Sequence, residues 1–217
     1  MKKLFTAIRQ NDLATVRQLL LKNPDLIACT AKQPPKKDDG QSPLQVALKT
    51  GHFDIVDYLL DCGADVNFIE DNTCCNHWRA PVIHDAINAA VMSSRWNVNS
   101  EIYGGLKVAN TKEKADRAYG VLKRMVEKKS DTNALDSFGN SCLCRACLQA
   151  RQILPSYNHA EHKLNNDRVL TEELVFDLSR IFRMLLDHGA NNDYVAPNFG
   201  RTLKEMYRDE PLEQFLV

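Results

Sequence analysis

One pattern of apolar and polar positions recurs along the chain: two adjacent apolar residues, two mostly polar residues and two more apolar residues. It is clearest at residues 55–60, 121–126 and 181–186, and weaker copies lie at residues 16–20 and 212–216. Apolar residues at positions i, i+1, i+4 and i+5 share one face of an α-helix. The pattern therefore predicts five equivalent amphipathic helices, each of which buries a single face.

The residues around these helices repeat as well. Gly63 and Gly189 follow two of the helices, where glycine adopts the left-handed conformation that ends a helix. Ahead of two of them stand Gly40-Gln41-Ser42-Pro43-Leu44 and Gly139-Asn140-Ser141-Cys142-Leu143. A serine cap, with proline at the first helical position in one copy, predicts the start of another, shorter helix. Each unit is thus predicted to contain a turn, a short helix, a second turn, an amphipathic helix and a stop.

This order of elements resembles the ankyrin repeat. The resemblance is most complete from Asp39 to Asn67, and it is partial through Ile83-His84-Asp85-Ala86 and through residues 136–146. It implies an all-α solenoid of helix pairs with short β-hairpin fingers, in which the first helices line a concave face and the second helices form the convex back. It also implies a structural role for His52 and His84, as donors or acceptors to loop and helix backbone.

The chain is longer than five repeats of about 33 residues. We expect one solenoid over residues 1–217, with units at about 1–36, 37–70, 71–135, 136–194 and 195–217, and with degenerate caps as the first and last units. The extra residues fall in a Pro/Lys-rich first finger, in a lengthened finger at 71–79, and in two large inter-helix insertions at about 93–114 and 155–170. These insertions share one edge of neighbouring repeats and are expected to pack together. An alternative is that residues 72–114 form a separate small module.

Composition narrows the class of function. The 217 residues include 28 basic and 28 acidic side chains and have zero net charge, so no overall field attracts nucleic acid or an anionic membrane. No segment approaches the roughly 20 apolar residues that span a bilayer. Seven clustered cysteines favour a reducing compartment with free thiols, and we expect a cytoplasmic protein.

Catalytic and metal-binding motifs are weak. Phosphate-binding glycine loops and nucleophile elbows are absent from the sequence, so an enzyme is not expected. The alternative function is a small-ligand or zinc-binding module built from the insertions and the clustered cysteines. Its candidate ligands are Cys74, Cys75, His77, Cys142, Cys144, Cys147, His159 and His162. The repeat register makes Cys142, Cys144 and Cys147 packing residues instead, so we expect no metal and no cofactor, and a small-molecule ligand is unlikely on this interpretation.

The leading hypothesis is a protein-interaction scaffold that binds a protein partner through its concave face and finger tips. The resemblance places the variable positions at the finger tips and on the exposed face of the first helices. The candidate partner-binding residues are Asp39, Gln41, Lys49, His77, Trp78, Asn88, Ser137, Phe138, Asn140, Gln149, Phe199 and Arg201. Trp78, Phe138 and Phe199 form an aromatic row, which is typical of interaction hot spots; the competing interpretation is that these rings pack on the hairpins. A host-directed effector that uses ankyrin repeats is a further alternative.

Overall fold

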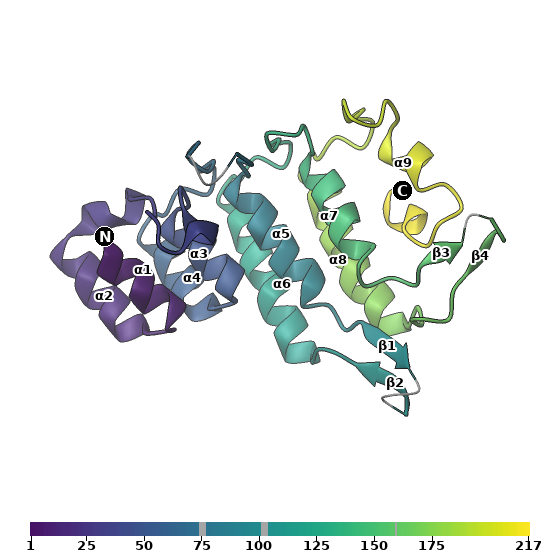
Figure 1. Cartoon of the computed structure of the whole chain (residues 1–217), viewed down its shortest axis with the longest axis horizontal. Coiled ribbons are helices and arrows are strands. Elements are labelled where there is room, and N and C mark those ends of the chain that lie inside the picture. The colour runs from purple at the N-terminus through teal and green to yellow at the C-terminus, as the bar shows by residue number, and fades with distance from the viewer. Residues whose placement is uncertain (74–76, 101–103, 159) are drawn as a thin grey trace.

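The chain folds into a row of helix pairs in the computed structural model, which describes residues 1–73, 77–100, 104–158 and 160–217. Figure 1 shows the pairs stacked from the N-terminus to the C-terminus along the long axis. The helices are α1 (Lys2–Arg9), α2 (Leu13–Lys22), α3 (Pro43–Thr50), α4 (Phe53–Asp61), α5 (Val82–Met92), α6 (Lys112–Glu127), α7 (Cys142–Ala150), α8 (Glu172–Asp187) and α9 (Leu203–Met206). Short 3₁₀ turns are η1 (Pro24–Ala28), η2 (Lys36–Asp38) and η4 (Glu213–Phe215).

Successive units stack through equivalent helices. The first helices α1, α3, α5 and α7 contact one another in sequence order, and the second helices α2, α4, α6 and α8 do the same. Their facing apolar side chains form one continuous core that runs from Leu4 to Leu216. An all-α repeat fold is therefore confirmed.

Two of the first helices, α3 and α7, begin at the serine caps that the sequence predicts. Ser42 accepts a hydrogen bond from the amide of Gln45, and the Gln45 side chain accepts one from the amide of Ser42. Ser141 caps α7 with one such bond, by accepting from the amide of Cys144. At the preceding turn Gly40 has φ +83°, and an added Cβ would lie 2.7 Å from the carbonyl oxygen of Asp71. That turn therefore requires glycine both for its conformation and for the close approach of the next finger.

The cap of α3 gives a first prediction. Replacing Ser42 with alanine removes the acceptor for the Gln45 amide, and we expect the free energy of unfolding to fall by about 1–2 kcal/mol. The measurement is chemical denaturation followed by circular dichroism. Ser42→Thr is the control, because threonine keeps a hydroxyl acceptor for the Gln45 amide. Equal losses in both variants would contradict a capping role.

Neighbouring repeats are also joined by a ladder of asparagines. Asn67 donates to the carbonyl oxygen of Lys129 and accepts from the amide of Asp131, at 3.2 and 2.7 Å. Asn133 repeats this arrangement one unit later with Gly189 and Asn191, at 2.8 and 2.7 Å. These bonds join the turn that follows each second helix to the equivalent turn of the next repeat, and so fix the spacing of the repeats there.

Two hairpins lie between paired helices at one edge of the row, as Figure 1 shows. Strands β1 (Asn97–Ser100) and β2 (Gly105–Val108) separate α5 from α6, and β3 (Tyr157–Asn158) and β4 (Lys163–Leu164) separate α7 from α8. The Asn97 side chain donates to the carbonyl oxygen of Val169 and accepts from its amide, at 2.7 and 2.8 Å. The two insertions thus contact each other directly.

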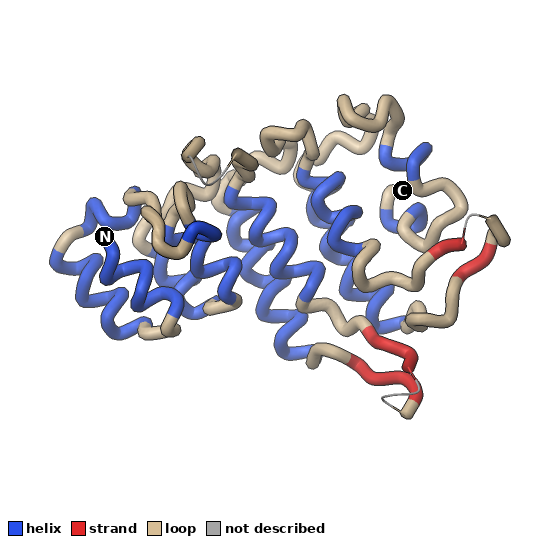
Figure 2. Tube along the Cα trace, viewed as in Figure 1, coloured by secondary structure: helices blue, strands red, loops and turns tan. Residues whose placement is uncertain are grey.

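Several expected details differ in the structure. Residues 112–114, assigned to the first insertion, belong to α6, because Thr111 caps that helix by accepting from the amide of Lys114. Within the described residues, regular strands occur only in the insertions (Figure 2), and the fingers contain isolated bridges at Ile69–Pro81 and Val195–Thr202. The expected fifth back helix is only the 3₁₀ turn η4, although its apolar residues Leu212, Phe215 and Leu216 are buried. Among the described helices, none combines the length and apolar character needed to cross a bilayer.

Candidate functional site

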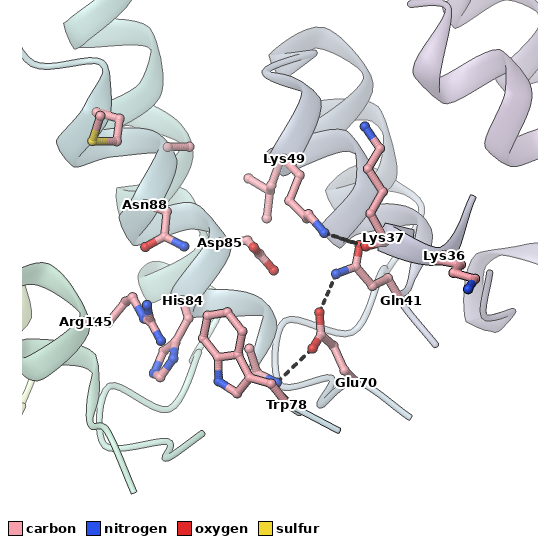
Figure 3. A pocket seen from close by; sticks show the side chains of 14 residues that line it. Lys36, Lys37, Gln41, Lys49, Glu70, Trp78, His84, Asp85, Asn88 and Arg145 are labelled. Atoms are coloured by element: carbon pink, nitrogen blue, oxygen red, sulfur yellow. Dashed lines mark hydrogen bonds between the residues drawn. The ribbon is translucent and has the colours of Figure 1, made fainter. Parts of the chain in front are cut away.

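A cavity of about 480 Å³ opens on the side of the first helices, between the second, third and fourth repeats. Its wall includes side chains from α3, α5 and α7, from η2 and from the fingers ahead of α3 and α5. Figure 3 shows Asp85, Asn88, Lys49, Gln41, Glu70 and Trp78 around it. Four predicted partner-binding residues line this cavity: Gln41, Lys49, Trp78 and Asn88.

On one wall of the cavity, successive hydrogen bonds connect Lys49, Gln41 and Glu70. The Lys49 ammonium group donates to Gln41 Oε1 at 2.9 Å, and Gln41 Nε2 donates to Glu70 Oε1. The second Glu70 oxygen accepts from the amide of Ala80 at 3.0 Å. These hydrogen bonds link the buried Glu70 carboxylate, through Gln41, to the Lys49 ammonium group on α3.

Two other lining residues, Trp78 and Arg145, both donate hydrogen bonds to Asp136. Its side chain accepts from Trp78 Nε1 at 3.1 Å and from Arg145 Nη2 at 2.9 Å. The Arg145 guanidinium carbon also lies 4.6 Å from the centroid of the Trp78 ring. Burial acts to raise the pKa of Asp136, but hydrogen bonds from Asn140, Phe138 and Trp78 outweigh it and hold the pKa below its ordinary value. Asp136 is therefore ionised at neutral pH and fixes the position of Trp78.

Asp85 lies in the cavity wall on α5. Its Oδ2 accepts from Gln45 Nε2 at 3.1 Å. Burial raises the pKa of Asp85 to about 7, and the nearby Glu70 charge adds to the shift. An ionised Asp85 is thus poorly compensated at neutral pH.

The two structural histidines contact backbone of other repeats or loops. His52 Nε2 lies 3.3 Å from the carbonyl oxygen of Arg9, and His84 Nε2 lies 3.2 Å from that of Ala134. Burial, with a smaller effect of Arg145, lowers the pKa of His84 to about 4, so the ring is neutral. His84 Nδ1 has no partner among the described residues. We attribute this to Pro81, which occupies the cap of α5 and lacks the amide that Ser42 supplies to Gln45 in α3.

The fingers expose two parallel sets of large apolar side chains. The exposed residues are Ile69, Leu135 and Val195 in one set, and Trp78, Phe138 and Phe199 in the other. The Trp78 and Phe138 ring centroids are 6.4 Å apart. Phe138 is 56% exposed, whereas the Trp78 ring is also held by Asp136 and Arg145. The aromatic set was predicted from the sequence and the aliphatic set was not, although an apolar residue recurs at the same place in three fingers.

The other predicted residues fall into two groups. Lys49, His77, Ser137, Phe199 and Arg201 are exposed, and Asn88, Asn140 and Gln149 are partly buried.

Asp39 and Gln41 were expected to be exposed, and that expectation is wrong. Asp39 accepts a hydrogen bond from the amide of Gln33 inside the first finger, and Gln41 is held between Glu70 and Lys49. Both side chains are therefore part of the packed finger base.

The cysteines of α7 are packed thiols. Cys142, Cys144 and Cys147 are buried, and burial raises the pKa of all three, to about 11 at Cys144. Cys74, Cys75 and His159 lie outside the described residues. Within the described part of the chain, no group of three or more histidine, cysteine or acidic residues is arranged to hold a metal ion.

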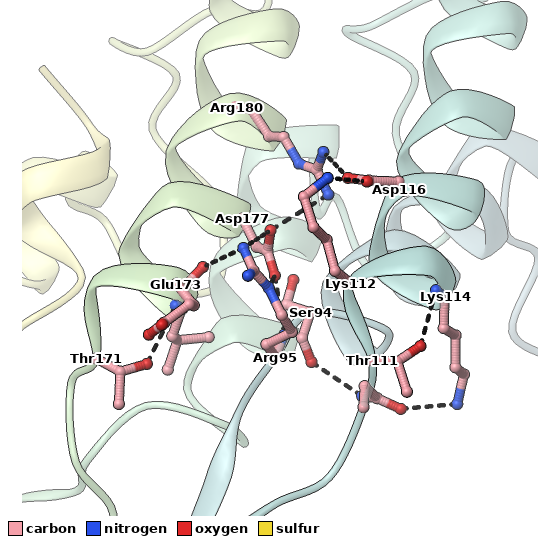
Figure 4. Close-up of polar contacts among 12 residues, drawn as sticks. Ser94, Arg95, Thr111, Lys112, Lys114, Asp116, Thr171, Glu173, Asp177 and Arg180 are labelled. Atoms are coloured by element: carbon pink, nitrogen blue, oxygen red, sulfur yellow. Dashed lines mark hydrogen bonds and ion pairs between the residues drawn. The ribbon is translucent and has the colours of Figure 1, made fainter.

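A second polar cluster attaches the first insertion to α8 (Figure 4). Arg95 Nε donates to Asp177 Oδ2 at 2.9 Å, and Arg95 Nη2 donates to Asp177 Oδ1 at 3.0 Å. The Arg95 backbone amide also donates to Asp177 Oδ2 at 3.0 Å, and Arg180 Nη2 lies 3.2 Å from Asp177 Oδ1. The Asp177 side chain is 0% exposed and that of Arg95 is 16% exposed, so this cluster joins repeats from the inside.

The stacked helix pairs define a helical repeat protein. Residues 3–89 match the family model described as ankyrin repeats (3 copies). Residues 3–89 therefore contain ankyrin repeats, and similar helix pairs continue through α8 beyond the matched segment. None of the curated proteins compared with the chain matches it.

Proposed function

We propose that the chain is a scaffold that binds a protein partner across its finger tips and concave face, without catalysis. The observation that carries the proposal is the double set of exposed apolar side chains on three successive fingers. Exposed apolar groups gathered in one place and surrounded by polar residues are typical of interaction surfaces. Ankyrin repeats generally mediate protein–protein interaction, which agrees with this use of the surface.

The fingers and the cavity form one continuous candidate surface. Trp78 belongs to both, because its ring lines the cavity and packs near Phe138. A partner laid along the fingers would therefore cover aromatic rings and reach Lys49 and Asn88 inside the cavity.

Phe138 and Phe199 provide the direct test. We expect the double variant Phe138→Ser, Phe199→Ser to weaken partner binding by at least about thirtyfold, since two exposed aromatic anchors are lost. The partner is first captured on the immobilised chain and identified by mass spectrometry. Its affinity for the purified wild-type chain and for the variant is then measured by calorimetry.

Phe176→Ser is the matched control. Phe176 is also 56% exposed but lies on α8, a second helix. The fingers are the binding surface if affinity falls in the finger variant alone. Equal affinity in the finger variant and the wild type would reject the proposal. Trp78 is less suitable for this test, because its contacts with Asp136 and Arg145 mean that its removal also lowers stability.

A further inference from the structure

The charges of the cavity wall are unequally compensated. Glu70 is linked through Gln41 to the Lys49 ammonium group, and Asp136 pairs with Arg145 at 2.9 Å. Asp85 receives only the neutral side-chain amide of Gln45 as a hydrogen-bond donor among the described residues, which also offer it no ion pair. A half-buried carboxylate that faces a cavity and has no ion-pair partner there can accept a hydrogen bond from a cation supplied by another molecule.

The remaining cations of the wall do not take that place. Figure 3 shows the ammonium groups of Lys36 and Lys37 directed away from Asp85. Lys49 already donates to Gln41 and to the carbonyl oxygen of Lys37, each at 2.9 Å.

Part of the cavity is apolar. Leu48, Ala89 and Met92 contribute to its lining beside Asp85 and Asn88. An aliphatic stem could be buried against this part while a charged head reaches the carboxylate, which is how lysine side chains divide between apolar and polar surroundings.

We propose that the cavity receives the side chain of a lysine from the protein partner, with its ammonium group on Asp85 and its stem against Leu48 and Met92. The inference rests on the proposed binding function and names the chemistry of the partner. Lysine is preferred to arginine because Asp85 Oδ2 is already used by Gln45, which leaves one oxygen open, whereas a guanidinium group is best matched by two.

This arrangement makes binding depend on pH in a defined direction. Binding needs the ionised form of Asp85, whose pKa of about 7 in the free protein means that affinity rises with pH. Between pH 6 and pH 8 we expect an increase of about tenfold. The groups around Asp85 are Glu70 from the finger ahead of α5, Lys49 from α3, Arg145 from α7, and His84 on α5 itself. Of these, His84 has its pKa near 4 and stays neutral in this range.

The test uses Nα-acetyl-lysine methylamide as the probe on the full chain. Binding is followed through the Trp78 indole and Asn88 amide signals in nitrogen–proton correlation spectra, at pH 6 and pH 8. We expect a dissociation constant of about 1–10 mM at pH 8, with at least tenfold weaker binding to Asp85→Asn. Asp25→Asn, an exposed acidic position in the first repeat, is the control variant and should bind like the wild type.

Other probes give the outcomes that would overturn the inference. The norleucine derivative carries the stem without the charge, and binding equal to that of lysine would show a purely apolar site. Stronger binding of the glutamate derivative, or an affinity that rises as pH falls, would show that the cavity binds an acidic group through Lys36, Lys37 and Lys49 instead. Absence of lysine binding while the captured partner still depends on Phe138 and Phe199 would reject this inference and leave the proposed function standing.

Discussion

The Asp177→Ala variant is expected to lose about 3–5 kcal/mol of its free energy of unfolding. The substitution leaves Arg95, whose side chain is 16% exposed, without the two carboxylate oxygens that it contacts at 2.9 and 3.0 Å. Arg180 loses one of its acidic partners as well. Uncompensated buried charge accounts for most of the cost, because the remaining guanidinium groups cannot regain their hydration in place. Urea denaturation followed by circular dichroism measures the loss.

Asp54→Ala supplies the comparison for this prediction. Asp54 pairs with Arg117 at 2.8 Å, but its side chain is 78% exposed. An exposed pair contributes at most about 1 kcal/mol, so the control should unfold nearly like the wild type. A loss in Asp177→Ala as small as that of the control would show that the cluster does not hold the insertion against α8.

The Asp85→Asn variant is expected to be more stable than the wild type at pH 8, by about 2 kcal/mol. The pKa of Asp85 is about 7 in the folded protein, against an ordinary value of 3.8. Between these two pH values the unfolded chain has released a proton that the folded chain still holds. The penalty for ionising Asp85 therefore grows as pH rises from about 4 and is complete above about 7. The gain is smaller than the full pKa difference implies, because solvent partly screens this half-buried group.

Two pH values are enough to check the sign. At pH 4 Asp85 is protonated in the folded state and only about half ionised in the unfolded state, so the penalty is under about 1 kcal/mol. Asp85→Asn and the wild type should therefore have similar free energies of unfolding. At pH 8 the variant should have the higher value, and the Gln45 side chain keeps an oxygen to which it can donate. A variant that is destabilised at pH 8 would show that ionised Asp85 has a favourable partner in the fold.

The repeat pattern was sufficient to predict the paired helices and the residues at which α3 and α7 begin. Ser42 and Ser141 cap α3 and α7 as expected, because a cap depends on residues within one turn of the helix. The last repeat was predicted less well. Pro211 precedes the final apolar residues, and only the 3₁₀ turn Glu213–Phe215 forms there. The pattern correctly marks those residues as buried, but it does not distinguish an α-helix from a shorter turn.

The candidate site was only partly predictable. The positions of Lys49, Trp78 and Asn88 were available from the repeat register, and all three line the cavity. Gln41 was expected at the surface but is packed, because Glu70 from the next finger bonds to it. Asp85 was not predicted as a site residue. Its signal in the sequence was a carboxylate among the apolar residues of a first helix.

The sequence by itself determined the ankyrin-like repeat pattern, the helix pairs, the serine caps and the places where extra residues interrupt the repeat. Those features depend on helical periodicity and on hydrogen bonds that span three or four residues. Only the tertiary structure decided which inner-face side chains share a cavity and which charges are compensated. The decisive contacts join residues far apart in the chain, 40 positions between Gln45 and Asp85 and 82 between Arg95 and Asp177. Burial and charge at such contacts depend on how neighbouring repeats pack, and no local pattern of residues encodes that separation.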